Sequence, residues 1–176
     1  MSGRLALILG GARSGKSRRA EALALEWGGD PVYLATAEPF DDEMRARVAQ
    51  HRADREGRGW VTVEEPLDLP AALAREAVAG RTVLVECLTT WVGNLMVHDW
   101  PVEPEFERLL AGIDGGMAAG LVLVANEVGL GIVPENRMAR AFRDHAGRLH
   151  QELAARAGRV ELVVAGIPVV VKEVKD

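Results

Sequence analysis

Short runs of apolar residues recur along the chain, and most of them end at glycine or at a polar residue. The first run, Leu5–Leu9, is followed by two glycines. A brief continuous apolar run of this kind is typical of a strand that is buried on both faces of a parallel sheet. The same pattern predicts further strands at Val32–Thr36, Val61–Val63, Thr82–Glu86, Leu121–Asn126, Val160–Val164 and Val169–Val171.

Stretches of helix-forming residues alternate with most of these runs. Lys16–Trp27 predicts a helix that ends at Gly28, and Asp41–Arg55 predicts another, with acidic residues first and basic residues last. A third helix is expected from Pro134 to Ala157, because proline is well tolerated in a first helical turn. The alternation of strand and helix predicts an α/β fold with a doubly wound, mostly parallel sheet.

The end of the chain departs from this alternation. Only residues 165–168 separate the last two predicted strands, so we expect an antiparallel hairpin at one edge of the sheet. A length of 176 residues fits one core, and the sequence contains no internal repeat. We therefore expect a single catalytic domain over residues 1–176.

Composition narrows the classes of partner. Hydrophobic residues make up 48% of the chain, but no apolar run reaches eighteen residues, so no membrane span is expected. A formal net charge of −5 argues against nucleic acid, which requires a basic face. Cys87 is the single cysteine, which agrees with a reducing cytoplasm. The composition therefore favours a cytoplasmic protein that acts on small molecules.

The string GGARSGKS, residues 10–17, fits the phosphate-binding pattern GxxxxGKS. It follows a predicted strand and precedes a predicted helix, which is the context that this P-loop motif requires. Its amides and the start of the helix would bind phosphate oxygens. Lys16 would reach the β and γ phosphates, and Ser17 would offer its hydroxyl to Mg²⁺. Lysine is otherwise rare, at positions 172 and 175 alone, which makes its presence here more informative.

P-loop proteins also carry an acidic residue at the end of a neighbouring strand, near the metal. Two residues fit this position, Glu86 after VLV and Glu127 after LVLVAN. Glu86 is the preferred candidate, with a solvated strand end as the alternative for either residue.

His51 is the candidate for covalent chemistry. Met44, Val48 and His51 are spaced by four and three residues, which places the imidazole on the inward stripe of its helix. Spacing alone leaves two interpretations open: a packed, hydrogen-bonded histidine, or a nucleophile that attacks phosphorus. In the second, nearby arginines such as Arg52 and Arg55 would neutralise phosphate charge.

Four segments together resemble one family: GGARSGKSRRAEALA, YLATAEPFDDEMRARVAQHR, LVECLTTWVGNL and NEVGLGIVPENRMARAFRDHAGRLHQELA. The chain is similar to the bifunctional adenosylcobinamide kinases and adenosylcobinamide-phosphate guanylyltransferases of cobalamin biosynthesis. The resemblance implies a RecA-like P-loop NTPase fold. It also implies that ATP or GTP phosphorylates adenosylcobinamide, after which GTP donates GMP to a histidine. That GMP then passes to adenosylcobinamide phosphate, giving adenosylcobinamide-GDP.

The resemblance implies the site residues as well. The guanylylated histidine falls on His51, where the preceding position is Gln50 rather than the second histidine of some members. The nucleotide contacts would be Gly10, Gly11, Ala12, Arg13, Ser14, Gly15, Lys16 and Ser17, then Thr36, Ala37 and Glu38, then Arg52, Ala53, Asp54 and Arg55, and finally the acidic Glu64 and Glu86. Glu65 is an alternative to Glu64. The resemblance further implies a homotrimer.

Two other functions are compatible with the P-loop. A simple small-molecule kinase would use Lys16, Ser17 and Glu86 in the same way without a covalent intermediate, and a switch-like NTPase module would need a partner surface. The position of the corrinoid stays open, because GLGIVPENR and residues 88–100 could each form a wall of its site.

Overall fold

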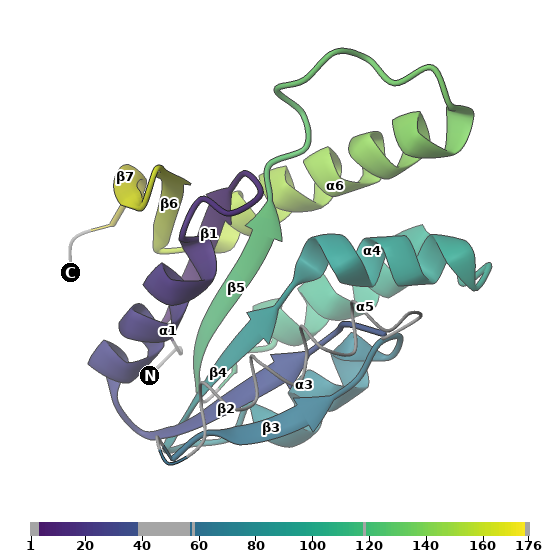
Figure 1. The fold of residues 1–176 in the computed structure, drawn as a ribbon. Helices are drawn as coiled ribbons and strands as arrows, with labels where there is room; N and C mark the ends of the chain where they lie inside the picture. Colours follow the sequence, from purple (N-terminus) through teal and green to yellow (C-terminus); the bar gives the residue numbers. More distant parts are fainter. Residues whose placement is uncertain (1–3, 39–56, 58, 118, 175–176) are drawn as a thin grey trace.

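A seven-stranded sheet forms the centre of the molecule, in the order β3-β2-β4-β5-β1-β6-β7 (Figure 1). The computed structural model describes residues 4–38, 57, 59–117 and 119–174. The strands are β1 Leu5–Gly10, β2 Asp30–Ala35, β3 Val61–Glu64, β4 Arg81–Glu86, β5 Gly120–Asn126, β6 Arg159–Val164 and β7 Ile167–Glu173. Neighbouring strands are parallel from β3 to β6, while β6 and β7 are antiparallel. The expected sheet and its edge hairpin are thereby confirmed.

Helices cover both faces of this sheet (Figure 1). They are α1 Lys16–Trp27, α3 Leu69–Glu76, α4 Leu88–Val97, α5 Val102–Asp114 and α6 Arg137–Arg156. Strand β1 shows why the central strands are apolar throughout: Leu7 belongs to the core beneath α3 to α6, whereas Ala6 and Ile8 belong to the core beneath α1. The helix expected over residues 41–55 lies outside the described residues.

Several element boundaries differ from the sequence-based expectation, and strand β7, for example, runs from Ile167 to Glu173 rather than from Val169 to Val171. Helix α6 begins at Arg137 rather than Pro134, because the Asn136 side-chain oxygen accepts hydrogen bonds from the amides of Met138 and Ala139 and so caps the helix. Strand β2 begins two residues earlier than expected, at Asp30.

The turn between β6 and β7 consists of Ala165 and Gly166, with φ values of 51° and 82°. Two successive positive φ angles are the geometry of a tight hairpin turn. They reverse the chain in fewer residues than the sequence suggested.

The carboxyl ends of β1, β2, β3, β4 and β5 meet at one edge of the sheet, because these strands are parallel. Ligands of open α/β sheets bind outside this edge. At this edge lie the glycine-rich loop, residues 36–38, Glu86 and the long β5–α6 connection. A ligand site is therefore expected here.

Candidate nucleotide-binding site

The loop from Gly10 to Ser17 is shaped by two glycines. A Cβ on Gly10 would lie 2.4 Å from Ser14 Oγ and 2.8 Å from the carbonyl oxygen of Val163, so no other residue fits. Gly15 has a φ of 92°, in the left-handed region that favours glycine. A Cβ on Gly15 would also lie 3.2 Å from the Cα of Gly166, in the β6–β7 turn. The Gly166 amide donates to the Ser14 carbonyl at 2.7 Å, which ties the loop to the edge hairpin.

Polar groups gather around the loop. Lys16 is 8% exposed, and its ammonium group donates to the Gly11 carbonyl at 3.2 Å, so it lies over the loop. Ser14 Oγ and Asn126 Oδ1 are buried and have no hydrogen-bond partner among the described residues. Since buried polar atoms are normally paired, these two are available to a ligand. The amides of the loop and of the start of α1 add donors for an anion.

Ser17 and Glu86 are brought together at the start of α1. The Ser17 hydroxyl donates to Glu86 Oε1 at 2.9 Å. Glu127 is engaged elsewhere, since its amide donates to the Gly10 carbonyl and its carboxylate accepts from the Gly129 amide. A hydroxyl and a carboxylate at this distance suit Mg²⁺, which prefers oxygen ligands and keeps several waters and phosphate oxygens. In the described part of the chain, no group of three or more His, Cys, Asp or Glu side chains could hold a metal ion.

Thr36 is fixed beside Glu86 by a closed set of hydrogen bonds. Its amide donates to the Glu86 carbonyl at 3.0 Å, and its hydroxyl donates to the Cys87 carbonyl at 2.8 Å. The Cys87 amide donates back to the Thr36 hydroxyl at 2.9 Å. Burial raises the pKa of the Cys87 thiol and the Glu86 carboxylate raises it further, so the thiol is neutral and serves packing rather than nucleophilic attack.

Asn94 is a buried residue of the site region that the sequence analysis did not identify. Its side-chain amide donates to the Thr36 carbonyl at 2.8 Å and to the Pro66 carbonyl at 3.0 Å. It therefore joins the ends of β2 and β3 to helix α4. The signal was present in the sequence, because Asn94 is a lone amide in the apolar helix LTTWVGNLMV.

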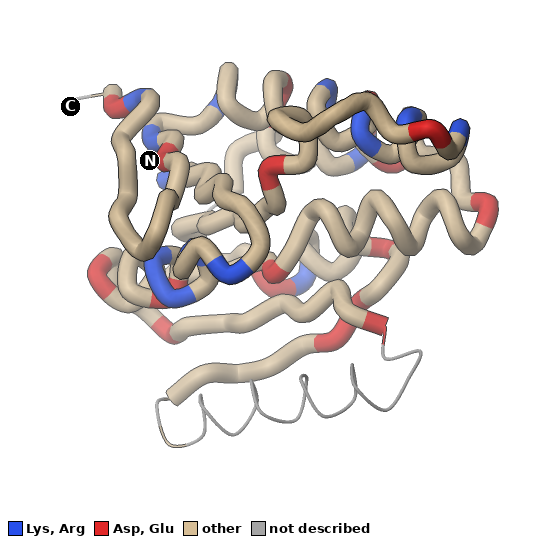
Figure 2. The backbone as a smooth tube through the Cα atoms, turned by 45° about the horizontal axis from the view of Figure 1, so that its top comes forward, with Lys and Arg blue, Asp and Glu red and all other residues tan. Residues whose placement is uncertain are grey.

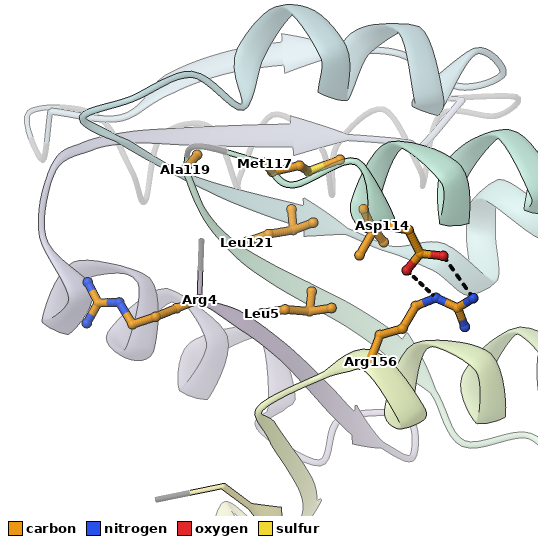
Figure 3. Close-up of a pocket in the computed structure, with 8 residues that line it drawn as sticks. Arg4, Leu5, Asp114, Met117, Ala119, Leu121 and Arg156 are labelled. Atoms are coloured by element: carbon orange, nitrogen blue, oxygen red, sulfur yellow. Dashed lines mark hydrogen bonds and ion pairs between the residues drawn. The ribbon is translucent and has the colours of Figure 1, made fainter. Parts of the chain in front are cut away.

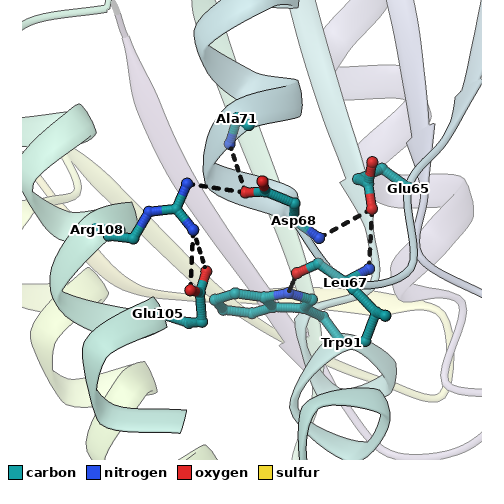
Figure 4. A network of polar contacts seen from close by, with 7 residues as sticks. All are labelled: Glu65, Leu67, Asp68, Ala71, Trp91, Glu105 and Arg108. Atoms are coloured by element: carbon teal, nitrogen blue, oxygen red, sulfur yellow. Dashed lines mark hydrogen bonds and ion pairs between the residues drawn. The ribbon is translucent and has the colours of Figure 1, made fainter. Parts of the chain in front are cut away.

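The loop after β3 is held by the polar network of Figure 4. Glu65 Oε1 accepts from the amides of Leu67 and Asp68, and the Trp91 indole donates to the Leu67 carbonyl at 2.7 Å. Asp68 caps α3 and also binds Arg108. Glu65 thus serves the loop, whereas Glu64 is exposed at the end of β3, in register with Ala35.

The remaining expected contacts fall in different places. Glu38 lies close to α4, where its carboxylate is 2.8 Å from His98 Nε2. Arg13 is exposed at the tip of the loop with a φ of 54°. Outside the described residues lie His51, Arg52, Ala53, Asp54 and Arg55.

A hollow of about 250 Å³ lies at the opposite edge of the sheet (Figure 3). Leu5 and Leu121, near the starts of β1 and β5, form part of its lining. Beside them, Arg156 makes two hydrogen bonds to Asp114, at 2.8 and 3.1 Å, and thereby joins α6 to α5. The hydrogen bonds from Arg156 hold the pKa of Asp114 below its usual value. This pair is structural and lies away from the phosphate loop.

The fold and the loop define a nucleotide-binding protein of the RecA-like P-loop NTPase class. The structure resembles a RadB recombinase, with a TM-score of 0.53 and 15% identity over 92% of this chain and 74% of that one. It also resembles the P4 protein of bacteriophage phi6 in complex with ADP, with a TM-score of 0.51 and 16% identity over 96% of this chain and 54% of that one. Similarity at this level of identity establishes the fold alone.

Sequence comparison gives the family. Residues 6–171 match the model of the cobinamide kinase / cobinamide phosphate guanyltransferase family, and the chain belongs to that family. It is 51% identical to the bifunctional adenosylcobalamin biosynthesis protein CobP of Pseudomonas aeruginosa, over 94% of this chain and 96% of that one. It is 44% identical to the bifunctional adenosylcobalamin biosynthesis protein CobU of Escherichia coli, over 94% and 98% of the two chains. The resemblance stated from the motifs is confirmed.

Proposed function

We propose that this protein catalyses two reactions: it phosphorylates adenosylcobinamide, and it transfers GMP from GTP to adenosylcobinamide phosphate, forming adenosylcobinamide-GDP. The observation that carries the proposal is the family match over residues 6–171, on a chain whose phosphate loop places Ser17 against Glu86. The whole chain, residues 1–176, would act as one catalytic domain.

In the kinase step, the loop amides and Lys16 would hold the phosphates of ATP or GTP. Ser17 and Glu86 would hold Mg²⁺, which neutralises charge on the transferred phosphoryl group. The substrate hydroxyl would attack the γ phosphorus, the bond between that phosphorus and the β–γ bridging oxygen would break to release the nucleoside diphosphate, and the hydroxyl proton would pass to water. Buried Lys16 supplies a positive charge in a site of low dielectric, where it stabilises the transition state more than it would in water.

In the second reaction, His51 would attack the α phosphorus of GTP and release pyrophosphate. An oxygen of adenosylcobinamide phosphate would then attack the same phosphorus and displace the histidine, which divides one transfer into two displacements. Besides the loop Gly10–Ser17 and Glu86, the proposed nucleotide contacts are Thr36, Ala37, Glu38 and Glu64 among the described residues, and then Arg52–Arg55. Support comes from the motif match and from the hydrogen bonds that hold Thr36 beside Glu86.

Labelling with GTP separates this proposal from a simple kinase. Incubation with GTP labelled at the α phosphorus should give a protein adduct that is labile in acid and stable in base, and His51→Ala should abolish it. His145→Gln, on α6 and outside the proposed site, is the matched control and should label normally. An unlabelled native protein that still phosphorylates adenosylcobinamide would show a kinase without the covalent step.

A homo-oligomer is also proposed, a trimer by family resemblance. Edge strand β7 exposes Ile167, Val169, Val170 and Val171, which are between 47% and 66% accessible. A long apolar edge strand needs cover, since it otherwise pairs with other chains indiscriminately. Val171→Lys should shift the sedimentation coefficient toward that of a monomer, while unchanged sedimentation would exclude β7 from the interface.

The cytoplasm is the proposed compartment, on the strength of the family resemblance and the single free cysteine. As a separate finding, none of the helices in the described ranges is long and apolar enough to cross a bilayer.

A further inference from the structure

Helices α4 and α6 enclose a groove of about 370 Å³. The groove lies between the second half of α4 and the first turns of α6. Its lining residues are Gly93, Met96 and Val97 from α4, and Asn136, Met138, Ala139 and Phe142 from the start of α6. None of these side chains carries a charge.

Apolar side chains are unusually accessible in and near this groove. Val97 is 57% exposed and Met138 is 49% exposed. Helix α4 contains no charged residue and is tan in Figure 2. A concentration of exposed apolar side chains that is rimmed by polar groups marks a binding site.

Asn136 adds a directed polar group to the rim. Its side-chain oxygen already accepts from the amides of Met138 and Ala139, so its orientation is fixed. The NH₂ group of the same amide is then a donor suited to a carbonyl oxygen of a ligand. The groove therefore fits an apolar ring surface that carries a hydrogen-bond acceptor, such as an amide carbonyl, at its periphery.

Each wall of the groove is connected along the chain to the nucleotide site. Helix α4 starts two residues after Glu86, which binds Ser17. The β5–α6 connection starts at Glu127, whose amide donates to the Gly10 carbonyl at 3.0 Å. With a rise of about 1.5 Å per residue, Gly93 and Val97 lie about 8 and about 14 Å along α4 from its first residue. This offset suits a substrate whose reacting arm extends from a broad ring system.

We propose that the α4–α6 groove holds the corrin ring of the cobinamide substrate. The aminopropanol arm would then extend along α4 toward Ser17 and Glu86. This inference rests on the proposed function, because the family match identifies the substrate class. It brings together the two segments that sequence alone left as alternatives, since residues of α4 and Asn136, which precedes α6, line the same groove.

The test is the double variant Val97→Gln/Met138→Gln. Both positions are about half exposed, so the substitutions remove apolar surface from the groove without opening the core. The matched control is Leu25→Gln/Val78→Gln, because these side chains are 47% and 44% exposed and lie outside the groove. The assay measures the Kd for adenosylcobinamide from its visible absorption, and separately the labelling by α-labelled GTP, which requires no corrinoid.

The expected result is a rise in Kd of about tenfold or more for the groove variant, with native labelling by GTP and a native Kd for the control. A native Kd for the groove variant, or an equal rise in Kd for the control, would overturn the groove assignment and leave the proposed function intact. Failure of the unmodified protein to bind corrinoid and to label with GTP would instead overturn the proposed function.

Discussion

Replacing Glu161 by glutamine tests the buried ion pair that joins α1 to β6. Glu161 is 0% exposed and accepts two hydrogen bonds from Arg19, at 2.7 and 2.8 Å, and one from Arg159 at 2.6 Å. Glutamine keeps the size of the side chain but removes its charge and one acceptor oxygen. Two arginines then lose their shared counter-charge.

The structure sets the expected magnitude. Removing one partner of a fully buried ion pair costs about 3–5 kcal/mol of unfolding free energy. The Arg19 and Arg159 side chains are 21% and 27% exposed, so water can partly replace the carboxylate. We therefore expect about 2–3 kcal/mol for Glu161→Gln. At about 2–4 °C per kcal/mol for a chain of this size, Tm should fall by about 4–12 °C.

The matched control is Glu173→Gln. Glu173 also binds Arg159, at 2.8 Å, but its side chain is 44% exposed. An exposed pair of this kind contributes about 0–1 kcal/mol, so Tm should fall by no more than about 4 °C. Differential scanning calorimetry of the three proteins makes the comparison.

The effect of pH gives a second readout. Burial alone would raise the pKa of Glu161, but the hydrogen bonds from Arg19 and Arg159 outweigh it and leave the pKa below the usual value. A carboxyl whose pKa is lower in the folded state stabilises the protein above its unfolded pKa, about 4.3, and loses that effect as pH falls through the folded value. The difference in Tm between native protein and variant should therefore be full near pH 7 and shrink below about pH 4. A Tm change under about 1 °C at pH 7, or a difference that does not shrink in acid, would refute this reasoning.

Three further predictions concern α4 and the phosphate loop. Trp91→Phe should lower the unfolding free energy by about 2–4 kcal/mol in denaturant titrations, because it shrinks a fully buried side chain and leaves the Leu67 carbonyl without its indole donor. Gly93→Ala should raise the unfolding free energy by about 0.5–1 kcal/mol, because alanine favours the helix and its Cβ would lie at an ordinary 3.8 Å from Phe142 Cε2. A fall in stability would show that the added methyl group does not fit against Phe142. Glu86→Gln should keep a hydrogen bond to Ser17 but lower the kcat of the kinase reaction about 100-fold, with native Tm, and a kcat within about threefold of native would remove Glu86 from the metal site.

The fold was predictable from sequence because its central strands are buried on both faces. A strand such as LALIL, followed by a glycine loop, leaves few alternatives to a parallel sheet. The boundaries of α6 were less predictable. Proline at position 134 is compatible with a helix start, but the Asn136 side chain determines where the helix begins, and both signals lie within three residues.

The candidate site was predictable where a motif fixes backbone geometry and less so where distant elements meet. Gly10 to Ser17 was identified from eight consecutive residues, whereas the amide of Asn94 joins two strand ends that precede it by 58 and 28 residues. A groove formed by α4 and α6 depends on how two helices pack, which residue spacing along either helix does not reveal.

The two-residue turn at Ala165 and Gly166 links the last strand to the first functional loop. Because the Gly166 amide holds the Ser14 carbonyl, residues near opposite ends of the sequence support each other at the phosphate cradle. Loss of the C-terminal strand by proteolysis would therefore weaken nucleotide affinity as well as the sheet, and the last twelve residues cannot be treated as a dispensable tail.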